Sequence, residues 1–225
     1  MTGNDGDPGS FLDAIDDTDR STLLSLGRTR RFSKGNSLFN EGSRSERVMI
    51  LIEGRAKVAR ATEDGKEAML ALRGPGDLLG EMSVFDGEPH SASATALEDC
   101  DGLVLTRAEF TSFLEEHPRA ALVLLSMLTQ RLRDADDKRA DFLAYDAESR
   151  VARGLVELAE RFGEPTDAGL RIQVALSQEE LGGWLGASRE SVSKALHRMR
   201  SRGWIETHRR GITVVDIEAL RQRAS

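Results

Sequence analysis

An uninterrupted helical stretch from about Pro118 to Tyr145 constrains the fold of this chain more than any other feature. Globular helices average about 11–12 residues, whereas this one would be about 40 Å long at 1.5 Å per residue. Within it, spacings of three and four alternate, the pattern of a coiled-coil seam. The row comprises Leu125, Leu128, Leu132, Ala135, Arg139 and Phe142. Because a small barrel cannot cover so long a helix, we expect two chains to pair along this row. The alternative is a helix that lies on its own barrel.

The stretch from Arg31 to about Leu105 consists of short β-prone runs separated by turns that contain glycine. The runs are residues 37–39, 48–52, 56–59, 68–72, 92–96 and 102–105, and Glu41-Gly42, Glu53-Gly54 and Asp64-Gly65 are turns between them. Several short strands at regular spacing predict an antiparallel jelly-roll-like barrel. Before them, residues 11–26 fit one or two short helices, and residues 1–10 a disordered N-terminus.

A helix-turn-helix is the strongest local pattern after the long helix. Ser177 and Glu180 form a capping box that starts a helix at Gln178, and Leu181, Trp184 and Leu185 give it an apolar face. Gly186 ends this helix and Ser188 caps the next one, which turns Val192, Leu196 and Met199 inward. An outward face of polar residues at the start of a second helix is typical of DNA readers.

Several of these polar side chains suit contacts with bases and phosphates. Arg189 has the forked donors that pair with guanine, Glu190 can accept from cytosine, and Lys194 lies one turn further on. The capping serines and the amides at both helix starts suit phosphates. The candidate DNA-binding residues are Ser177, Gln178, Glu180, Ser188, Arg189, Glu190, Ser191, Lys194, Arg209 and Arg210. Residues 203–207 and 211–215 predict a hairpin wing whose tip is His208 to Arg210, and residues 161–171 read as a loop.

The formal net charge of −7 is unevenly distributed along the chain. Residues 147–225 carry 13 Lys and Arg against 11 Asp and Glu, whereas residues 1–146 carry 18 against 27. Such an asymmetry allows local binding of phosphates by an acidic protein. It predicts a regulatory half joined to a nucleic-acid-binding half.

Composition excludes several other classes. No apolar run reaches the roughly 20 residues that span a bilayer, and no secretory signal is recognisable, so we expect a cytoplasmic protein without a membrane partner. The single Cys100 cannot by itself hold an iron–sulfur cluster or zinc. No nucleophile–base pair and no metal-ligand spacing indicates an enzyme.

The segment LSQEELGGWLGASRESVSKAL resembles the helix-turn-helix of the CRP/FNR regulators, and the segments FSKGNSLFNEGSRSERVMILIEGRAKV and RGPGDLLGEMSVFDGEP resemble their cyclic-nucleotide-binding barrel. The resemblance covers about residues 11–220. It implies an α+β chain with an N-terminal antiparallel jelly-roll barrel (11–116), a dimerisation helix (117–146) and a C-terminal winged helix-turn-helix domain (147–225). It further implies a homodimer on double-stranded DNA with two-fold symmetric, GTGA-like half-sites, and a contact of residues 162–169 with RNA polymerase.

The same resemblance implies an effector pocket made by Gly80, Glu81, Met82, Ser83, His90, Ser91, Ala135 and Asp136. Gly80 and Glu81 match the family's glycine and ribose-binding acid. His90 stands where the family has the phosphate-binding arginine, and Ala135 and Asp136 replace its adenine-contacting Thr/Ser pair. A neutral imidazole offers one donor where arginine offers a charged fork.

These departures leave three interpretations open. The effector is a cyclic nucleotide, or it is a cyclic dinucleotide, or the chain is a constitutive, ligand-independent DNA binder. A nucleotide-gated protein-interaction module is the alternative to DNA binding as such.

Overall fold

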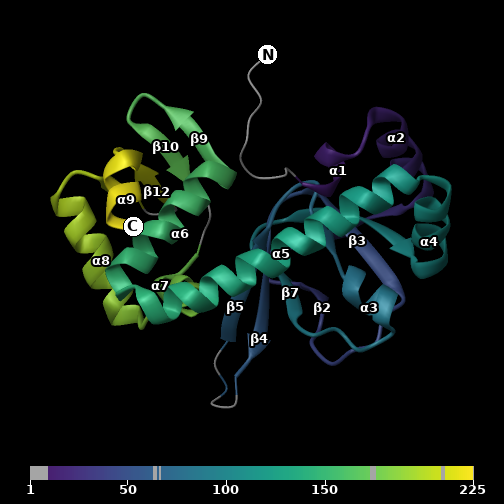
Figure 1. Ribbon diagram of the computed structural model, residues 1–225, viewed down its shortest axis with the longest axis horizontal. Coiled ribbons are helices and arrows are strands. Elements are labelled where there is room, and N and C mark those ends of the chain that lie inside the picture. Colours follow the sequence, from purple (N-terminus) through teal and green to yellow (C-terminus); the bar gives the residue numbers. More distant parts are fainter. Residues whose placement is uncertain (1–9, 63–64, 66, 173–175, 209–210, 225) are drawn as a thin grey trace. The chain divides into compact units, whose positions relative to one another are not determined.

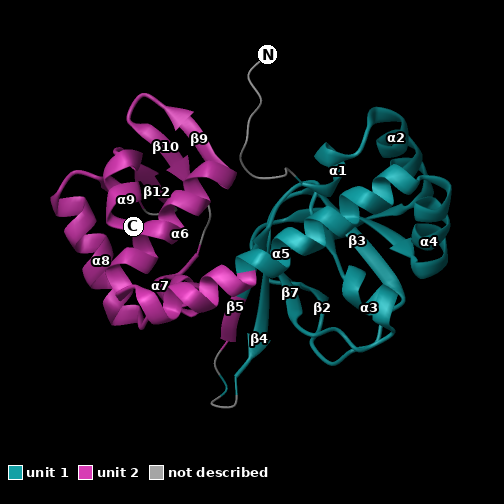
Figure 2. Ribbon diagram, in the orientation of Figure 1, with its two compact units in different colours: residues 1–65, 70–134 teal, residues 66–69, 135–225 magenta. Residues whose placement is uncertain are grey.

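The computed structural model describes residues 10–62, 65, 67–172, 176–208 and 211–224 (Figure 1). The chain forms two compact units, and Figure 2 shows them in different colours. Unit 1 comprises residues 1–65 and 70–134, and unit 2 comprises residues 66–69 and 135–225. The prediction for the N-terminus falls mainly on residues 1–9, which lie outside the described residues. Ser10 differs from the prediction, because its side chain caps the first helix.

Unit 1 begins with two short helices and continues as two four-stranded sheets. The helices are α1 (Phe11–Ala14) and α2 (Asp17–Leu26). One sheet has the order β1-β8-β3-β6, with strands Arg28–Phe32, Cys100–Thr106, Arg47–Glu53 and Leu78–Leu79. The other has the order β2-β7-β4-β5, with strands Ser37–Phe39, Ser93–Ala96, Ala56–Ala61 and Glu67–Arg73. All the recorded strand pairs are antiparallel, in agreement with the jelly-roll prediction.

Strand β3 is buried on both faces, and its alternating side chains enter two different cores. Val48 and Ile50 join a cluster with Phe110 and Leu124 from the helices that follow the barrel. Met49 and Leu51 join a second cluster inside the barrel. A strand that is covered on both faces reads as a continuous apolar run, as Val48–Ile52 does in the sequence.

Helices α3 (Glu81–Asp86) and α4 (Arg107–Glu116) complete the barrel, and α5 (Pro118–Ala144) is the predicted long helix. Ala120, Leu124 and Met127 of α5 pack into the core that also holds Val48. The long helix therefore has a barrel-facing side in its first half. Leu128 of the predicted row packs partly against the same core, whereas Leu125, Leu132 and Phe142 are exposed.

After the last part of α5, the described residues of unit 2 form four helices and one antiparallel sheet. Its helices after α5 are α6 (Ala147–Phe162), α7 (Gln178–Leu185), α8 (Arg189–Ser201) and α9 (Ile217–Ala224). The sheet has the order β11-β12-β10-β9, with strands Ile205–His208, Gly211–Val214, Gly169–Ile172 and Gly163–Thr166. Buried apolar side chains of all four helices and of β11 form the interior.

The loop predicted for residues 161–171 is wrong. Helix α6 continues to Phe162, and β9 and β10 form a hairpin whose Leu170 lies opposite Pro165. Glycine, proline and aspartate hide this hairpin in the sequence, because its strand character comes from pairing with β12, some 40 residues away. Pro165 is tolerated because β9 is an edge strand and its neighbour on the other side is solvent.

Candidate DNA interface and effector site

Helix α7 begins and ends as its sequence predicts. The Glu180 amide donates to Ser177 Oγ at 3.1 Å, and the Ser177 amide donates to Glu180 Oε2 at 2.9 Å, so the capping box is confirmed. Gly186 ends the helix with φ +61°, a left-handed conformation that glycine adopts without strain. Ala187 follows, and its amide donates to the Gly182 carbonyl at 2.9 Å. These bonds fix the sharp turn into α8.

Helix α8 separates an apolar side from a polar side. Ser188 caps it by accepting from the Ser191 amide at 3.1 Å. Four of its apolar side chains are buried in unit 2, namely Val192, Ala195, Leu196 and Met199. Its exposed side chains near the N-terminus are Arg189, Glu190, Ser193, Lys194 and His197, while Ser191 is half-buried. Because the core fixes the apolar side, the polar first turns face solvent.

Of the charged side chains in these first turns, Glu190 and Lys194 form an ion pair and Arg189 does not take part in it. Lys194 Nζ lies 2.6 Å from Glu190 Oε1, one helical turn apart, and both side chains are mostly exposed. The hydrogen bond from Lys194 and its charge lower the pKa of Glu190. Arg189 has no hydrogen bond or ion pair with any described residue. Its guanidinium is therefore available to a ligand.

Arg150 holds the helix-turn-helix to the start of α6. Its guanidinium donates to the carbonyls of Leu185 at 2.9 Å and Gly186 at 2.7 Å, at the end of α7. It also donates to the Tyr145 carbonyl at 2.5 Å, just beyond α5. Carbonyls at helix ends lack partners within their own helix, so one arginine satisfies three of them. The sequence reading did not single out this residue.

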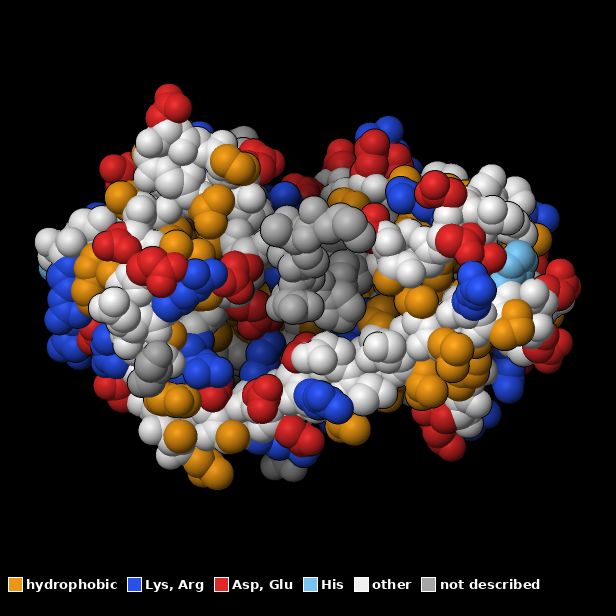
Figure 3. Space-filling model, turned by 45° about the horizontal axis from the view of Figure 1, so that its top comes forward, with side chains coloured by type: hydrophobic (Ala, Val, Ile, Leu, Met, Phe, Trp, Pro, Cys, Tyr) orange, Lys and Arg blue, Asp and Glu red, His pale blue; other side chains and the backbone are white. Residues whose placement is uncertain are grey.

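The predicted wing is present as β11 and β12, whose register joins Ile205 to Val214 and His208 to Gly211. His208 Nε2 lies 2.9 Å from Thr213 Oγ1 and ties the two strands together. Arg209 and Arg210, the predicted basic tip, lie outside the described residues. Figure 3 shows Lys and Arg side chains gathered along its left margin, where α8 lies in Figure 1.

The coiled-coil row of α5 lies at the surface. Leu125 is 61% exposed, Leu132 62% and Phe142 57%, although all three are large and apolar. Ala135 and Arg139 are exposed too, and only Leu128 is half-buried, against the barrel core. Exposed apolar side chains in one continuous row are typical of an interaction surface.

The candidate effector site in unit 1 centres on α3 and the loop that follows it. Gly80 precedes the helix with φ +80°, which favours glycine, and Glu81 and Ser83 are buried in its first turn. His90 is buried as well. Its Nδ1 lies 2.9 Å from Ser83 Oγ, and its ring stacks on Phe39 with 4.5 Å between centroids. Burial lowers the pKa of His90, against a smaller opposing effect of Glu81, so the imidazole is neutral near pH 7.

The acidic residue of this candidate site, Glu81, forms a buried ion pair with Arg131. Arg131 Nη1 lies 2.7 Å from Glu81 Oε1, and Arg131 Nη2 donates to the Leu78 carbonyl at 3.0 Å. The sequence reading missed Arg131, although a pattern could have found it. Arg131 continues the barrel-facing row of Leu124 and Met127 at spacings of three and four, and a charge on that side needs a buried partner.

The remaining predicted effector residues are less enclosed. Met82 and Ser91 belong to the same segment as Glu81 and His90 but have exposed side chains. Ala135 and Asp136 are exposed on the part of α5 that belongs to unit 2, where Asp136 pairs with Arg139 at 3.3 Å. His90 Nε2 is buried without a hydrogen-bond partner among the described residues. The buried side chain at position 90 is therefore a neutral imidazole and not a permanently charged guanidinium.

A nucleotide-type barrel, a long helix and a winged helix-turn-helix together define a DNA-binding regulator with an effector-type domain. Comparison with known proteins agrees with this class. Residues 29–117 match the cyclic nucleotide-binding domain family, and residues 149–223 match the Crp-like helix-turn-helix domain family. The chain belongs to the CRP/FNR family of transcription regulators.

Curated relatives and solved structures extend along most of the chain. The "CRP-like cAMP-activated global transcriptional regulator" of Mycobacterium tuberculosis is 37% identical over 193 residues, which is 86% of each chain. The "Cyclic AMP receptor protein" of Thermus thermophilus is 34% identical over 181 residues, or 80% of each. FixK2 from Bradyrhizobium japonicum shares the fold with a TM-score of 0.79 at 22% identity, over 89% of this chain and 98% of that one.

Described helices include none that is long and apolar enough to cross a membrane. The described residues also contain no group of three or more His, Cys, Asp or Glu side chains that could hold a metal ion.

Proposed function

We propose that this regulator is a homodimer that pairs along the exposed row of α5 and reads a two-fold symmetric DNA site with α8. The single observation that carries the proposal is the free Arg189 guanidinium at the exposed first turn of α8. In the major groove, such a side chain pairs with guanine through two hydrogen bonds. Glu190 and Lys194 lie next to it and form an ion pair with each other. When DNA binds, this pair breaks or also contacts bases and phosphates.

The proposed dimer follows from the surface of α5. Burying Leu125, Leu132 and Phe142 against a second copy removes apolar surface from water. A two-fold dimer presents two α8 helices, and one turn of DNA separates its half-sites by about 34 Å. We assign residues 11–116 to the effector domain, 117–146 to the dimerisation helix and 147–225 to the DNA-binding domain. RNA polymerase is the proposed partner of residues 162–169, most of which form the β9–β10 hairpin.

Effector control is the second part of the proposal. The M. tuberculosis relative is named for activation by cAMP, and the barrel matches a cyclic nucleotide-binding family. Ligand-independent DNA binding is the second candidate, favoured by the neutral, buried His90 at the phosphate position. A cyclic dinucleotide is the remaining alternative.

Two measurements test the proposal. Arg189→Ala should weaken binding to the specific site by about 1–3 kcal/mol and leave binding to random DNA nearly unchanged. Equal losses on both DNAs, or no loss on either, would contradict base reading by Arg189. Calorimetric titration of the dimer with cyclic AMP, cyclic GMP and cyclic di-GMP, followed by DNA binding with and without each, separates effector control from ligand-independent binding.

A further inference from the structure

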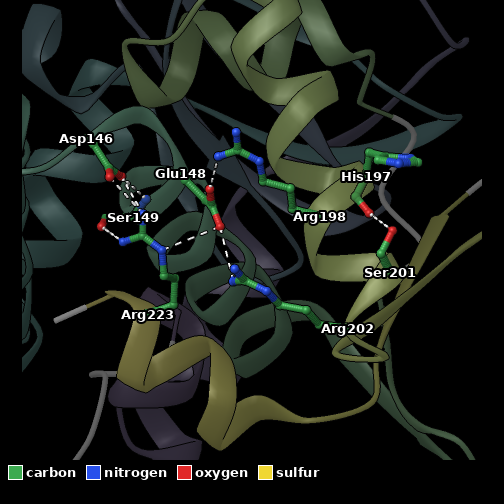
Figure 4. Close-up of polar contacts among 8 residues, drawn as sticks. All are labelled: Asp146, Glu148, Ser149, His197, Arg198, Ser201, Arg202 and Arg223. Atoms are coloured by element: carbon green, nitrogen blue, oxygen red, sulfur yellow. Dashed lines mark hydrogen bonds and ion pairs between the residues drawn. The ribbon is translucent and has the colours of Figure 1, made fainter.

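A buried carboxylate at the start of α6 pairs with three arginines, one on α8, one directly after α8 and one on α9. Glu148 is the second residue of α6, and its side chain is only 10% exposed. Its Oε2 lies 2.7 Å from Arg198 Nη1, and its Oε1 lies 3.4 Å from Arg202 Nη1 and 3.5 Å from Arg223 Nε. Figure 4 shows Glu148 between these side chains; Arg198 lies on α8, and Arg202 is the residue that ends it. The cluster lies entirely within unit 2.

The three arginines do not depend on Glu148 equally. Arg223 also binds both carboxylate oxygens of Asp146, at 2.9 and 2.7 Å, and it donates to Ser149. Arg198 and Arg202 have Glu148 as their only acidic partner among the described residues. Although their side chains are 61% and 50% exposed, Glu148 holds the guanidinium of each beside α6. Arg202 also lies over the Trp204 ring, 4.8 Å from its centroid. Loss of the Glu148 charge would therefore remove the ion pairs of Arg198 and Arg202, whereas Arg223 would keep Asp146.

Arg198 and Arg202 lie close to the side of α8 that is proposed to bind DNA. Lys194, Arg198 and the C-cap residue Arg202 are spaced by four, so they follow one side of α8 from its polar first turns to its end. Unbound arginines on that side can reach the phosphates that flank a groove, and contacts with phosphates carry no base information. An arginine held by a buried acid is oriented toward the protein instead.

We propose that Glu148 is a specificity-determining positioning residue, which holds Arg198 and Arg202 against α6 and keeps their charges out of sequence-independent phosphate binding. This inference rests on the proposed reading of DNA by α8. Glu148 touches no DNA in this role. It acts through the two arginines, and its removal should lower the ratio of specific to non-specific affinity.

Glu148→Gln is the primary test, because glutamine keeps the shape and removes the charge. Binding to random duplex DNA is measured by fluorescence anisotropy across a salt series. The slope of log K against log[salt] should become steeper by about 0.9 for each arginine that gains a phosphate. Non-specific affinity should rise at low salt. The triple variant Glu148→Gln, Arg198→Ala, Arg202→Ala should return to the wild-type slope.

Glu160→Gln is the matched control. Glu160 lies on the same helix, and its ion-pair partner is Arg221 of α9, at 2.6 Å. This variant should keep the wild-type slope. A purely structural role of Glu148 would lower thermal stability and affinity for all DNA without making the slope steeper, and that result would overturn the proposal.

Arg198→Ala, Arg202→Ala in the wild-type background tests the inference even if Glu148→Gln fails to fold. With Glu148 present, the two arginines should contribute little to the slope on random DNA, so this double variant should match the wild type. A slope shallower by about 0.9 per arginine would show that both already contact phosphates, and would contradict the inference. A separate measurement tests whether α8 reads DNA at all. If it does not, Arg189→Ala will bind the specific site with unchanged affinity.

Discussion

Leu132→Ala should weaken the proposed dimer without harming the protomer. Leu132 is 62% exposed in the single chain, so most of its side chain is free to be buried by a partner. Truncation to alanine removes three side-chain carbons, and burial of each contributes about 0.8 kcal/mol. Scaled by the exposed fraction, the loss is about 1.5 kcal/mol per copy and about 3 kcal/mol for a symmetric pair. The dissociation constant of the dimer should rise about 100-fold.

Sedimentation velocity across a concentration series measures this constant, and circular dichroism checks the fold. Leu24→Ala is the control, because Leu24 is an exposed leucine on α2 and does not belong to the row. It should leave the dissociation constant unchanged. Leu124→Ala, in the barrel core, should instead destabilise the protomer by about 2–5 kcal/mol. A wild-type chain that sediments as a monomer, or a Leu132→Ala dimer as tight as the wild type, would refute pairing along this row.

Three further predictions concern the effector site and the helix caps. His90→Arg should tighten cyclic AMP binding at least about 10-fold in calorimetry, because a charged hydrogen bond contributes about 1.5–3 kcal/mol; unchanged affinity would show that His90 does not occupy the phosphate position. Asp146 has a pKa lowered to about 2, first by the Ser149 amide and then by Arg223. Its contribution to stability is therefore complete above about pH 4 and lost as the pH falls through about 2. The difference in urea midpoint between the wild type and Asp146→Asn should shrink over that range, and a constant difference would contradict it. Ser177→Ala should lower the free energy of unfolding by about 0.5–2 kcal/mol in a urea titration through loss of the α7 cap, whereas an unchanged midpoint would show that the cap contributes nothing.

Elements defined by local chemistry were predictable from the sequence. The starts of α7 and α8 follow from Ser177 and Ser188, because a cap is a bond between residues three apart. The long helix follows from its length and spacing. The run 48–52 gives β3 because burial on both faces makes it continuously apolar.

Elements defined by distant partners were not predictable in the same way. Strand β1 is an edge strand with four exposed residues before Phe32, so its sequence shows no apolar alternation. The β9–β10 hairpin depends on β12. The helices α4 and α9 also went unassigned, although Thr106 and Glu109 form a capping box at the start of α4.

The same distinction holds for the candidate sites. The exposed polar turn of α8 could be read from spacing, because a helix fixes which side chains share a face. The Glu81–Arg131 pair and the Glu148 cluster join residues 50 or more apart in the chain. Helical spacing can mark Arg131 as barrel-facing, but it does not identify the partner of a buried charge. Sequence reasoning thus predicted the exposed polar turns of α8 better than the ion pairs formed by residues far apart in the chain.

Selection of binding sequences from a random DNA pool by the purified protein tests the central claim most directly. Two chains that each present one α8 helix should enrich an inverted repeat whose half-site centres lie about 10–10.5 base pairs apart. The Arg189→Ala protein should lose the preference at one guanine in each half-site. Enrichment of a single unrepeated motif, or no enrichment at all, would contradict a two-fold dimer that reads DNA through α8.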